Sequence, residues 1–496
     1  MKIFRGSTLD GVSKSSGDAV PFYHEGKYHV FFLTPPYGTT TYPDRLRITW
    51  RHLCSDNLVD WEELPPALIP GDGCEADKDG CWTGSVIFAE GKFHAIYTGY
   101  QIDSQYPQTI CHATSDDGIV WEKDPSNPII IPKTDLFEQY DWRDPDVFYN
   151  EDDGAYWVIL SARRNHGPIT KRGCILLYKS SDMLHWEYFG PLYEPWHTMC
   201  PECPEMYKLG SRWYLCYSRF SESAGTMYRV ADTPYGPWRT PSRDTIGNRR
   251  FYAAKSMAND EGRRFYFGWI HDKSENMDDG DWYWGGTYVI PHEVYAEADG
   301  ELGVKMPQEI AASFDKGLSF SLRPTLGEIR KYGANSFAVN AVGTLNYGFF
   351  ELDGAEHSFM LKCKIRIGDC RDQVGLILKA KEDLSRYYAL TLDWGMQRAS
   401  LTKLPMPLDP FWEETLPFKP VHQKQDPEGP RVCEKPFPFR NGDLIDVKVV
   451  IDGDIMEIFL GERAAFTYRS FSPADHQLGW MVQDGCADFL DIRFAK

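Results

Sequence analysis

Residues 22–33 read FYHEGKYHVFFL, and the same pattern occurs four more times within the first 290 residues. In each copy a short apolar strand reaches a glycine-containing turn, and an aromatic-rich alternating strand leaves it, which is typical of a β-hairpin. The turn glycines stand between 52 and 65 residues apart. The other four copies are IFAEGKFHAIYTG (87–99), FYNEDDGAYWVILSA (148–162), MYKLGSRWYLCYS (206–218) and MANDEGRRFYFGWI (257–270).

A second motif, which opens on a turn and ends in tryptophan, follows most of these hairpins. Two hairpin-like pairs per period make a four-stranded sheet, and five such sheets around one axis make a five-bladed β-propeller. The alternative is an ordinary β-sandwich with similar hairpins, and five copies of the hairpin pattern together with the repeated tryptophan motif make this alternative less favoured. The motif reads SDNLVDW (55–61), SDDGIVW (115–121), SSDMLHW (180–186) and, more loosely, ADTPYGPW (231–238).

The repeat ends near residue 295, and the pattern of the remaining chain is different. We expect a propeller over 1–295, a connector over 296–325 and a β-sandwich over 326–496. Stretch 404–440 carries nine prolines and is expected to be a long irregular loop. The alternating segments that favour the sandwich are 357–367, 374–381, 387–394, 443–452 and 455–461.

Composition agrees with this all-β organisation. The chain has 496 residues, 15% of them aromatic, with 42 glycines and 33 prolines, which favours two domains made of short strands and tight turns. A formal net charge of −19 argues against nucleic acid or an anionic membrane as partner. The first residues lack the apolar run of a secretion signal, so a cytoplasmic location is expected. A neutral or weakly charged substrate fits this charge better.

Twelve cysteines are scattered mostly as single residues inside apolar runs, which indicates reduced core thiols rather than a disulfide framework. His197, Cys200 and Cys203 have a spacing that metal ligands also show. Zinc sites usually need a second ligand pair, and the other candidates lie far away in sequence. We therefore expect neither a metal nor another cofactor.

Carboxylates occupy one matching position in three of the five repeats. Each stands five residues before a tyrosine of the hairpin, and the corresponding slots of the other two repeats are Gly84 and Ala253. Equivalent positions at the start of innermost propeller strands converge on one mouth of the axis. The three pairs are Asp18 and Tyr23, Asp144 and Tyr149, and Glu202 and Tyr207.

Three carboxylates in one pocket suit glycoside cleavage. Like charges so close raise one another's pKa, which keeps one group protonated as a general acid. One carboxyl group can then protonate the leaving oxygen while another attacks the anomeric carbon or activates water. The alternative is that each carboxylate caps a turn or pairs with an arginine. Trp50, Trp82 and Trp142 stand near the expected mouth and are candidates for stacking on sugar rings, although any one of them could instead be core.

Several motifs, in order along residues 15–310, resemble those of glycoside hydrolase family 32, the β-fructofuranosidases that include invertases, levanases and inulinases. The arginine-aspartate-proline and glutamate-cysteine motifs carry two of the three carboxylates. The matching segments are Trp50-Arg51-His52 with Ser55-Asp56, Trp82-Thr83-Gly84-Ser85, Tyr97-Thr98-Gly99, Arg143-Asp144-Pro145, Glu202-Cys203-Pro204, Trp284-Gly285, Ile290-Pro291 and Met306-Pro307-Gln308-Glu309.

This resemblance implies a retaining mechanism with a fructosyl-enzyme intermediate. Asp18 would be the nucleophile, Glu202 the acid/base, and Asp144 the residue that binds sugar hydroxyls and stabilises the transition state. Retention requires the carboxyl groups of Asp18 and Glu202 to lie roughly 5–5.5 Å apart. No metal or organic cofactor is implied; the implied partner is a small carbohydrate substrate, and a monomer or homodimer is expected. The residues expected to bind the substrate are Trp50, Trp82, Thr83, Arg143 and Trp284.

The sequence departs from the family at the nucleophile motif. Where the family has WMNDPNG, this chain has Ser15-Ser16-Gly17-Asp18-Ala19-Val20-Pro21, so the asparagine beside the nucleophile is missing. The glutamine of a nearby QxNP element is also not evident. The substrate is therefore open between sucrose, a phosphorylated disaccharide, a short fructo-oligosaccharide and another furanoside. Arg45, Arg47 and Arg51 could hold a phosphate or could form a solvated face.

Two other functions are compatible with the same pattern. Propeller glycosidases of the arabinanase, arabinofuranosidase or xylosidase type also place two aspartates and one glutamate on five blades. A carbohydrate-binding propeller that lost catalysis through the altered first motif is the non-enzymatic alternative. The appended sandwich and the contiguous Glu202-Cys203-Pro204 favour the fructosidase interpretation.

Overall fold

The computed structural model describes residues 15–39, 41–221, 223–354, 358–406, 429–471 and 477–496. The chain divides into two compact units. One comprises Lys2–Asp272 and Tyr283–Leu302, and the other Lys273–Trp282 and Gly303–Lys496. Strands make up most of both units, and α1 (Gln308–Ser313), η1 (Asp44–Leu46) and η2 (Ser274–Asn276) are short helical turns. None of the helices among the described residues has the length and apolar character to cross a membrane.

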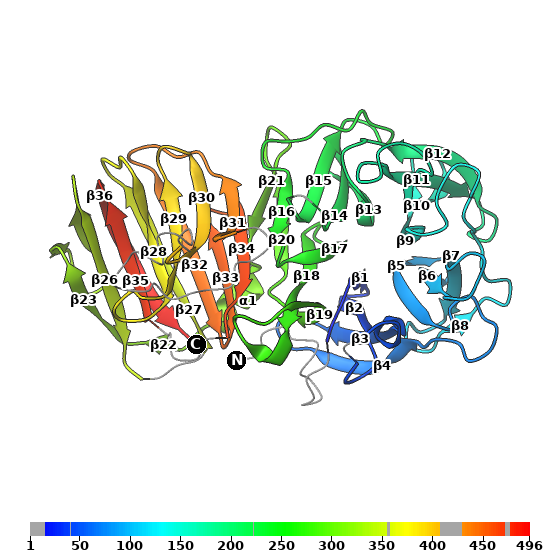
Figure 1. Cartoon of the computed structure of the whole chain (residues 1–496), viewed down its shortest axis with the longest axis horizontal. Helices are drawn as coiled ribbons and strands as arrows, with labels where there is room; N and C mark the ends of the chain where they lie inside the picture. The colour runs from blue at the N-terminus through cyan, green and yellow to red at the C-terminus, as the bar shows by residue number, and fades with distance from the viewer. Residues whose placement is uncertain (1–14, 40, 222, 355–357, 407–428, 472–476) are drawn as a thin grey trace, which may run out of the picture. The chain divides into compact units, whose positions relative to one another are not determined.

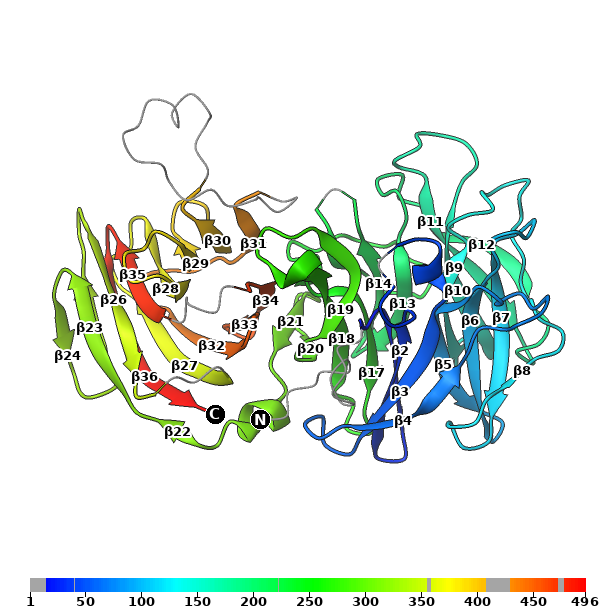
Figure 2. The same cartoon turned by 60° about the horizontal axis from the view of Figure 1, so that its bottom comes forward.

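The first unit is a five-bladed β-propeller, as predicted, with antiparallel sheets that follow one another in chain order. Figure 1 shows the innermost strands β1, β5, β9, β13 and β17 around the common axis, and Figure 2 shows the strands of the second blade, β5 to β8, side by side. The blades are β1 (Ala19–His24), β2 (Lys27–Thr34), β3 (Thr49–Ser55) and β4 (Glu62–Leu68); β5 (Gly80–Ala89), β6 (Lys92–Tyr100), β7 (Gln108–Ser115) and β8 (Glu122–Lys123); β9 (Arg143–Asn150), β10 (Ala155–Arg163), β11 (Gly173–Ser180) and β12 (Glu187–Tyr193); β13 (Glu202–Leu209), β14 (Arg212–Arg219), β15 (Gly225–Ala231) and β16 (Thr245–Asn248); and β17 (Tyr252–Ala258), β18 (Arg264–Lys273), β19 (Trp282–Tyr288), β20 (His292–Ala296) and β21 (Leu302–Lys305).

The two repeated motifs have clear local causes. The five hairpin glycines all adopt positive φ, between 62° and 82°, which explains why glycine stands at each of these turns. In the tryptophan motif Ser55 Oγ accepts the Leu58 N–H at 3.0 Å, and Trp61 Nε1 donates to the Leu58 carbonyl at 3.0 Å. The same bonds recur around Ser115 and Ser180. The motif is therefore a turn closed by its own side chains.

Neighbouring blades pack face to face through large apolar side chains. Between the first and second blades, Phe31 and Trp50 lie in one buried cluster with Val86 and Tyr97. Comparable clusters join the second to the third blade, the third to the fourth, and the fifth to the first. This packing holds the blades together in a ring and fixes the starts of the innermost strands around the axis.

The second unit contains two antiparallel sheets that share one buried core, as expected for a β-sandwich. Five of its strands, β27, β28, β29, β32 and β33, confirm the alternating segments predicted from sequence. The strands of one sheet are β22 (Gly317–Leu318), β24 (Ile329–Lys331), β25 (Phe337–Asn340), β27 (Ser358–Ile367), β32 (Leu444–Asp452), β33 (Ile455–Leu460), β34 (Ala464–Arg469) and β36 (Cys486–Ala495). Those of the other are β23 (Phe320–Leu326), β26 (Leu345–Leu352), β28 (Gln373–Ala380), β29 (Tyr387–Asp393), β30 (Arg398–Leu404), β31 (Arg431–Pro436) and β35 (Gln477–Gln483).

Two stretches differ from a simple domain-and-loop description. The expected connector, 296–325, contains β21, α1 and β22 in addition to parts of β20 and β23. The proline-rich stretch 404–440 is not irregular throughout, because it contains β31, which pairs with β30. Residues 407–428 of that stretch lie outside the described residues.

Candidate active site

Asp18, Asp144 and Glu202 line one pocket of about 490 Å³ in the propeller. They come from three different blades: Asp18 directly precedes β1, Asp144 lies in β9, and Glu202 begins β13. The sequence expectation that the blades bring these carboxylates together therefore agrees with the geometry. Four of the residues expected to bind substrate line the same pocket, namely Trp82, Thr83, Arg143 and Trp284.

A β-bulge near the start of the innermost strands aims these side chains into the pocket. In β9, β13 and β17 the strand pairing shifts by one residue at this level. The extra residue adopts a positive φ, which bends the strand and turns neighbouring side chains toward the axis. The bulge residues are Asp144 (φ 58°), Cys203 (φ 47°) and Ala253 (φ 46°).

The bulges correct the sequence alignment of the carboxylates. Asp144 is equivalent to Cys203, so Glu202 stands one residue earlier, at the position of Arg143 in β9 and Tyr252 in β17. Counting back from the hairpin tyrosines made Asp144 and Glu202 equivalent, which is wrong. The reason is that the two tyrosines are not equivalent: β9 and β13 have the same length, but Tyr149 is the second-last residue of β9 and Tyr207 the third-last of β13.

Asp18 is held by three donors. Its Oδ2 accepts the Thr83 hydroxyl at 2.6 Å and the Cys203 thiol at 3.4 Å, and its Oδ1 accepts Trp269 Nε1 at 3.1 Å. Burial raises the pKa of Asp18, the Glu202 carboxylate raises it further, and these hydrogen bonds oppose the shift. The carboxylate is thus fixed in orientation within a low-dielectric pocket.

Glu202 lies between a cation and a phenol. Arg143 Nη2 is 2.7 Å from its Oε1, and the Tyr252 hydroxyl donates to its Oε2. Burial raises the pKa of Tyr252 well above that of free tyrosine, and the neighbouring Glu202 carboxylate adds to the shift. Tyr252 therefore stays protonated and acts as a donor. Arg143 also pairs with Asp141, and its Nε lies 3.6 Å from Asp144 Oδ2.

Asp144 is almost fully buried, with 3% of its surface exposed. Its Oδ2 accepts the Cys203 N–H at 2.9 Å, and its own N–H donates to Thr98 Oγ1 at 2.8 Å. Burial raises the pKa of Asp144 to about 7; Arg143 lowers this pKa, and the charges of Asp18 and Glu202 raise it. Its protonation state therefore changes near neutral pH.

Trp50 does not belong to the pocket, which corrects the expectation that it binds substrate. It is 0% exposed, packs between the first two blades, and donates its Nε1 hydrogen to the Trp82 carbonyl at 3.0 Å. Trp142 is equally buried in the cluster between the second and third blades. Trp82 does line the pocket, where its ring stacks on Tyr100 with centroids 4.2 Å apart.

The residues considered as metal ligands each have a different partner. The Cys203 thiol binds Asp18, the Cys200 sulfur lies 3.6 Å from Arg143 Nη2, and His197 Nε2 lies 3.2 Å from the Tyr193 hydroxyl. Within the residues that the structure describes, no three His, Cys, Asp or Glu side chains are grouped so that they could hold a metal ion.

The three arginines considered for phosphate binding are also separated by their contacts. Arg45 is buried and donates to the Trp284 carbonyl, Arg51 pairs with Glu63, and Arg47 donates to the Gly71 carbonyl. Sequence reasoning missed Tyr252, which binds Glu202, and Trp269, which binds Asp18. Both lie in the fifth blade, where the aligned slot holds no acid, and only the closed ring brings them to the carboxylates.

Replacing Asp144 by asparagine should change how stability depends on pH. A folded-state pKa raised from 3.8 to about 7 means that the native protein loses stability as pH rises through this interval. The Asp144→Asn variant lacks this titration, so its unfolding free energy relative to wild type should increase by up to about 4 kcal/mol between pH 4 and pH 8. Thermal unfolding at both pH values measures the difference. If the unfolding free energies of variant and wild type differ by the same amount at pH 4 and pH 8, burial does not raise the pKa of Asp144 as assigned.

Comparison with known proteins places this geometry in a family. The model of the glycosyl hydrolases family 32 N-terminal domain matches residues 19–306. An insoluble beta-fructofuranosidase isoenzyme of Arabidopsis thaliana is 26% identical over 75% of this chain and 73% of its own length. Sucrose-6-phosphate hydrolase of Escherichia coli is 29% identical over 56% of this chain and 58% of its own length. The chain thus spans between about half and three quarters of these relatives.

Solved structures agree in fold. Fructan 1-exohydrolase IIa of Cichorium intybus superposes with a TM-score of 0.70 at 19% identity, covering 97% of this chain and 95% of that one. Sucrose-6-phosphate hydrolase of Lactobacillus gasseri gives 0.69 at 20% identity, covering 98% and 91%. Because the family model spans more than half of the sequence and includes two of the three pocket carboxylates, the chain belongs to glycosyl hydrolase family 32.

Proposed function

We propose that this protein is a retaining glycoside hydrolase that releases terminal β-fructofuranosyl groups from sucrose-like or short fructo-oligosaccharide substrates. The observation that carries the proposal is the meeting of Asp18, Asp144 and Glu202 in one pocket, each with a different set of partners. Relatives named beta-fructofuranosidase and fructan 1-exohydrolase support fructosides over the arabinofuranosidase or xylosidase alternative.

In the proposed first step the Asp18 carboxylate attacks the anomeric carbon of the fructosyl group. The bond from that carbon to the leaving oxygen breaks, and Glu202 gives its proton to this oxygen. In the second step Glu202 removes a proton from water, the resulting oxygen attacks the same carbon, and the bond to Asp18 breaks. Two displacements at one carbon retain its configuration.

The contacts of the pocket fit these roles. Thr83, Trp269 and Cys203 direct the Asp18 carboxylate, as a nucleophile requires. Arg143 stabilises the carboxylate that Glu202 becomes after proton donation, and the Tyr252 hydroxyl fixes the orientation of the same group. Asp144, with a pKa of about 7, can accept or donate a hydrogen bond to sugar hydroxyls.

The wall beside Asp18 explains how this pocket differs from the family motif. A Cβ atom at Gly17 would lie 2.6 Å from Cη2 of Trp284. The indole therefore occupies space beside the position where the family motif has asparagine. We propose that Trp284, together with Trp82, binds the sugar ring through apolar contact where relatives use an amide.

The non-catalytic alternative depends on the altered motif around Asp18. Although the residues beside Asp18 differ from the family motif, its carboxylate accepts three hydrogen bonds and lines the same pocket as Glu202. This arrangement favours catalysis over binding alone. The predicted cytoplasmic location and the monomeric or homodimeric state stay predictions.

Turnover of simple furanosides tests the proposed function. The wild type should release fructose from sucrose or kestose, and Asp18→Asn and Glu202→Gln should each lower kcat by at least about 1,000-fold, because each removes a group that takes part in bond breaking. Chromatography of the released sugar against an arabinofuranoside panel is the measurement. Release of arabinose in place of fructose, or equal behaviour of all three proteins, would refute the proposal.

Restoring the family residue at Gly17 should impair the pocket. In Gly17→Asn the new side chain must displace the Trp284 ring, so we expect KM to rise about tenfold or more. Gly333→Asn is the matched control, because this exposed glycine lies outside the propeller, has no positive φ, and has no atom within 4 Å of the added Cβ. A lower KM in Gly17→Asn than in wild type would show that the pocket prefers an amide.

A further inference from the structure

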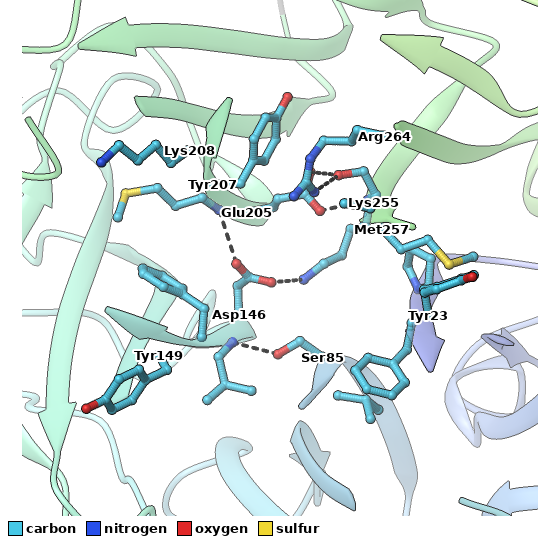
Figure 3. A pocket seen from close by; sticks show the side chains of 18 of the residues that line it. Tyr23, Ser85, Asp146, Tyr149, Glu205, Tyr207, Lys208, Lys255, Met257 and Arg264 are labelled. Atoms are coloured by element: carbon cyan, nitrogen blue, oxygen red, sulfur yellow. Dashed lines mark hydrogen bonds and ion pairs between the residues drawn. The ribbon is translucent and has the colours of Figure 1, made fainter. Parts of the chain in front are cut away.

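One layer of side chains, next to the bulges along the innermost strands, ties β5 to β9, β9 to β13 and β13 to β17. Two residues past the bulge level, a side chain accepts a backbone N–H of the following blade (Figure 3). The three residues that make these bonds are at most 8% exposed. The bonds are Ser85 Oγ to Val147 N at 2.7 Å, Asp146 Oδ2 to Met206 N at 3.1 Å, and Glu205 Oε2 to Ser256 N at 2.7 Å.

Lys255 holds the equivalent position in the fifth blade, where it brings a cation in place of an acceptor. Its side chain is 2% exposed. Nζ donates to Asp146 Oδ1 at 3.0 Å and to the Pro204 carbonyl at 3.5 Å. Burial alone would lower the pKa of Lys255, but Asp146 and Glu205 raise it above its ordinary value, so the ammonium form persists.

These contacts converge on the segment that carries Glu202. Lys255 binds the Pro204 carbonyl directly, and its partner Asp146 binds the Met206 N–H. From the pocket side, Asp144 binds the Cys203 N–H. The β13 bulge is thus held at three backbone atoms within residues 203–206, two of which depend on the Lys255–Asp146 pair.

We propose that Lys255 is a positioning residue for hydrolysis. Through its contacts with the Pro204 carbonyl and Asp146 it fixes the β13 bulge, and so keeps the Glu202 carboxyl group aligned with the scissile bond. The inference rests on the proposed function, since it assigns Glu202 the acid/base role. Loss of the ammonium would leave Asp146 and Glu205 buried without this counter-charge and would release the Pro204 carbonyl. A displacement of 1 Å at a reacting group is sufficient to slow catalysis strongly.

A cavity gives small molecules a route to this position. Lys255, Asp146 and Glu205 line a cavity of about 430 Å³, together with the rings of Tyr23 and Tyr207. Figure 3 shows the Lys255 ammonium turned toward Asp146 inside this cavity. A small amine can therefore replace a truncated lysine side chain without disturbing the substrate pocket.

The test compares Lys255→Met, Lys255→Gln and Lys255→Arg on sucrose or kestose. We expect Lys255→Met and Lys255→Gln to lower kcat about 10- to 100-fold with KM within about threefold of wild type, and Lys255→Arg to recover part of kcat. Lys379→Met is the matched control. Lys379 is also 2% exposed and donates to two backbone carbonyls, those of Gly453 and Ser470, in the second unit.

Both methionine variants remove a buried lysine, so both should lose stability, but only Lys255→Met should lose kcat. If Lys255→Met does not fold, Lys255→Gln carries the same comparison, because its amide still donates. In Lys255→Ala, added propylammonium should raise kcat, whereas propanol, which has the same length but no charge, should not.

The outcomes separate the two proposals. An inactive wild type overturns the proposed function and this inference together. An active wild type with unchanged kcat in Lys255→Met or Lys255→Gln overturns the positioning role alone. The same conclusion follows if Lys379→Met loses as much kcat as Lys255→Met, because the effect is then a general loss of stability.

Discussion

The site depends on one kind of buried hydrogen bond, in which a side chain of one blade accepts a backbone N–H of the next blade. Ser85, Asp146 and Glu205 make this bond at equivalent positions, just below the bulges. A buried N–H without a partner costs about 1–3 kcal/mol, so the bonds fix the spacing of adjacent strands. The bulges belong to these strands, so the fixed spacing of the strands also fixes the positions of the side chains that line the pocket.

The same scaffold gives three similar carboxylates different chemical properties. Asp18 and Asp144 are buried, whereas the Glu202 side chain is 21% exposed. Asp18 receives three donors, Glu202 an arginine and a tyrosine, and Asp144 mainly a backbone N–H. Their environments therefore separate a group suited to attack, a group suited to proton transfer, and a group whose charge changes near neutrality. In retaining glycosidases such a division of labour is the central requirement of the reaction.

Much of the fold could be predicted because its signals are local. Hairpin glycines and the serine-to-tryptophan turns each depend on a few adjacent residues, so their repetition identified the blades. The site was predicted less completely, because it depends on closure of the ring. Trp50 belongs to a motif that predicts a pocket residue, but its side chain is buried between the first two blades. Glu202 was aligned one residue out because Tyr149 and Tyr207 occupy different positions in strands of equal length. Tyr252 and Lys255 carry no signal until the fifth blade meets the fourth.

The central claim is that Asp18 forms a covalent bond to the fructosyl group. Glu202→Gln allows a direct measurement, because a fructoside whose leaving group needs no proton still reacts with Asp18, whereas the second step lacks its base. Acid quenching, proteolysis and mass spectrometry then locate the trapped group. We predict a fructosyl adduct on the peptide that contains Asp18. An adduct on the peptide that contains Asp144, or turnover by wild type with no adduct on any peptide of the variant, would contradict the claim.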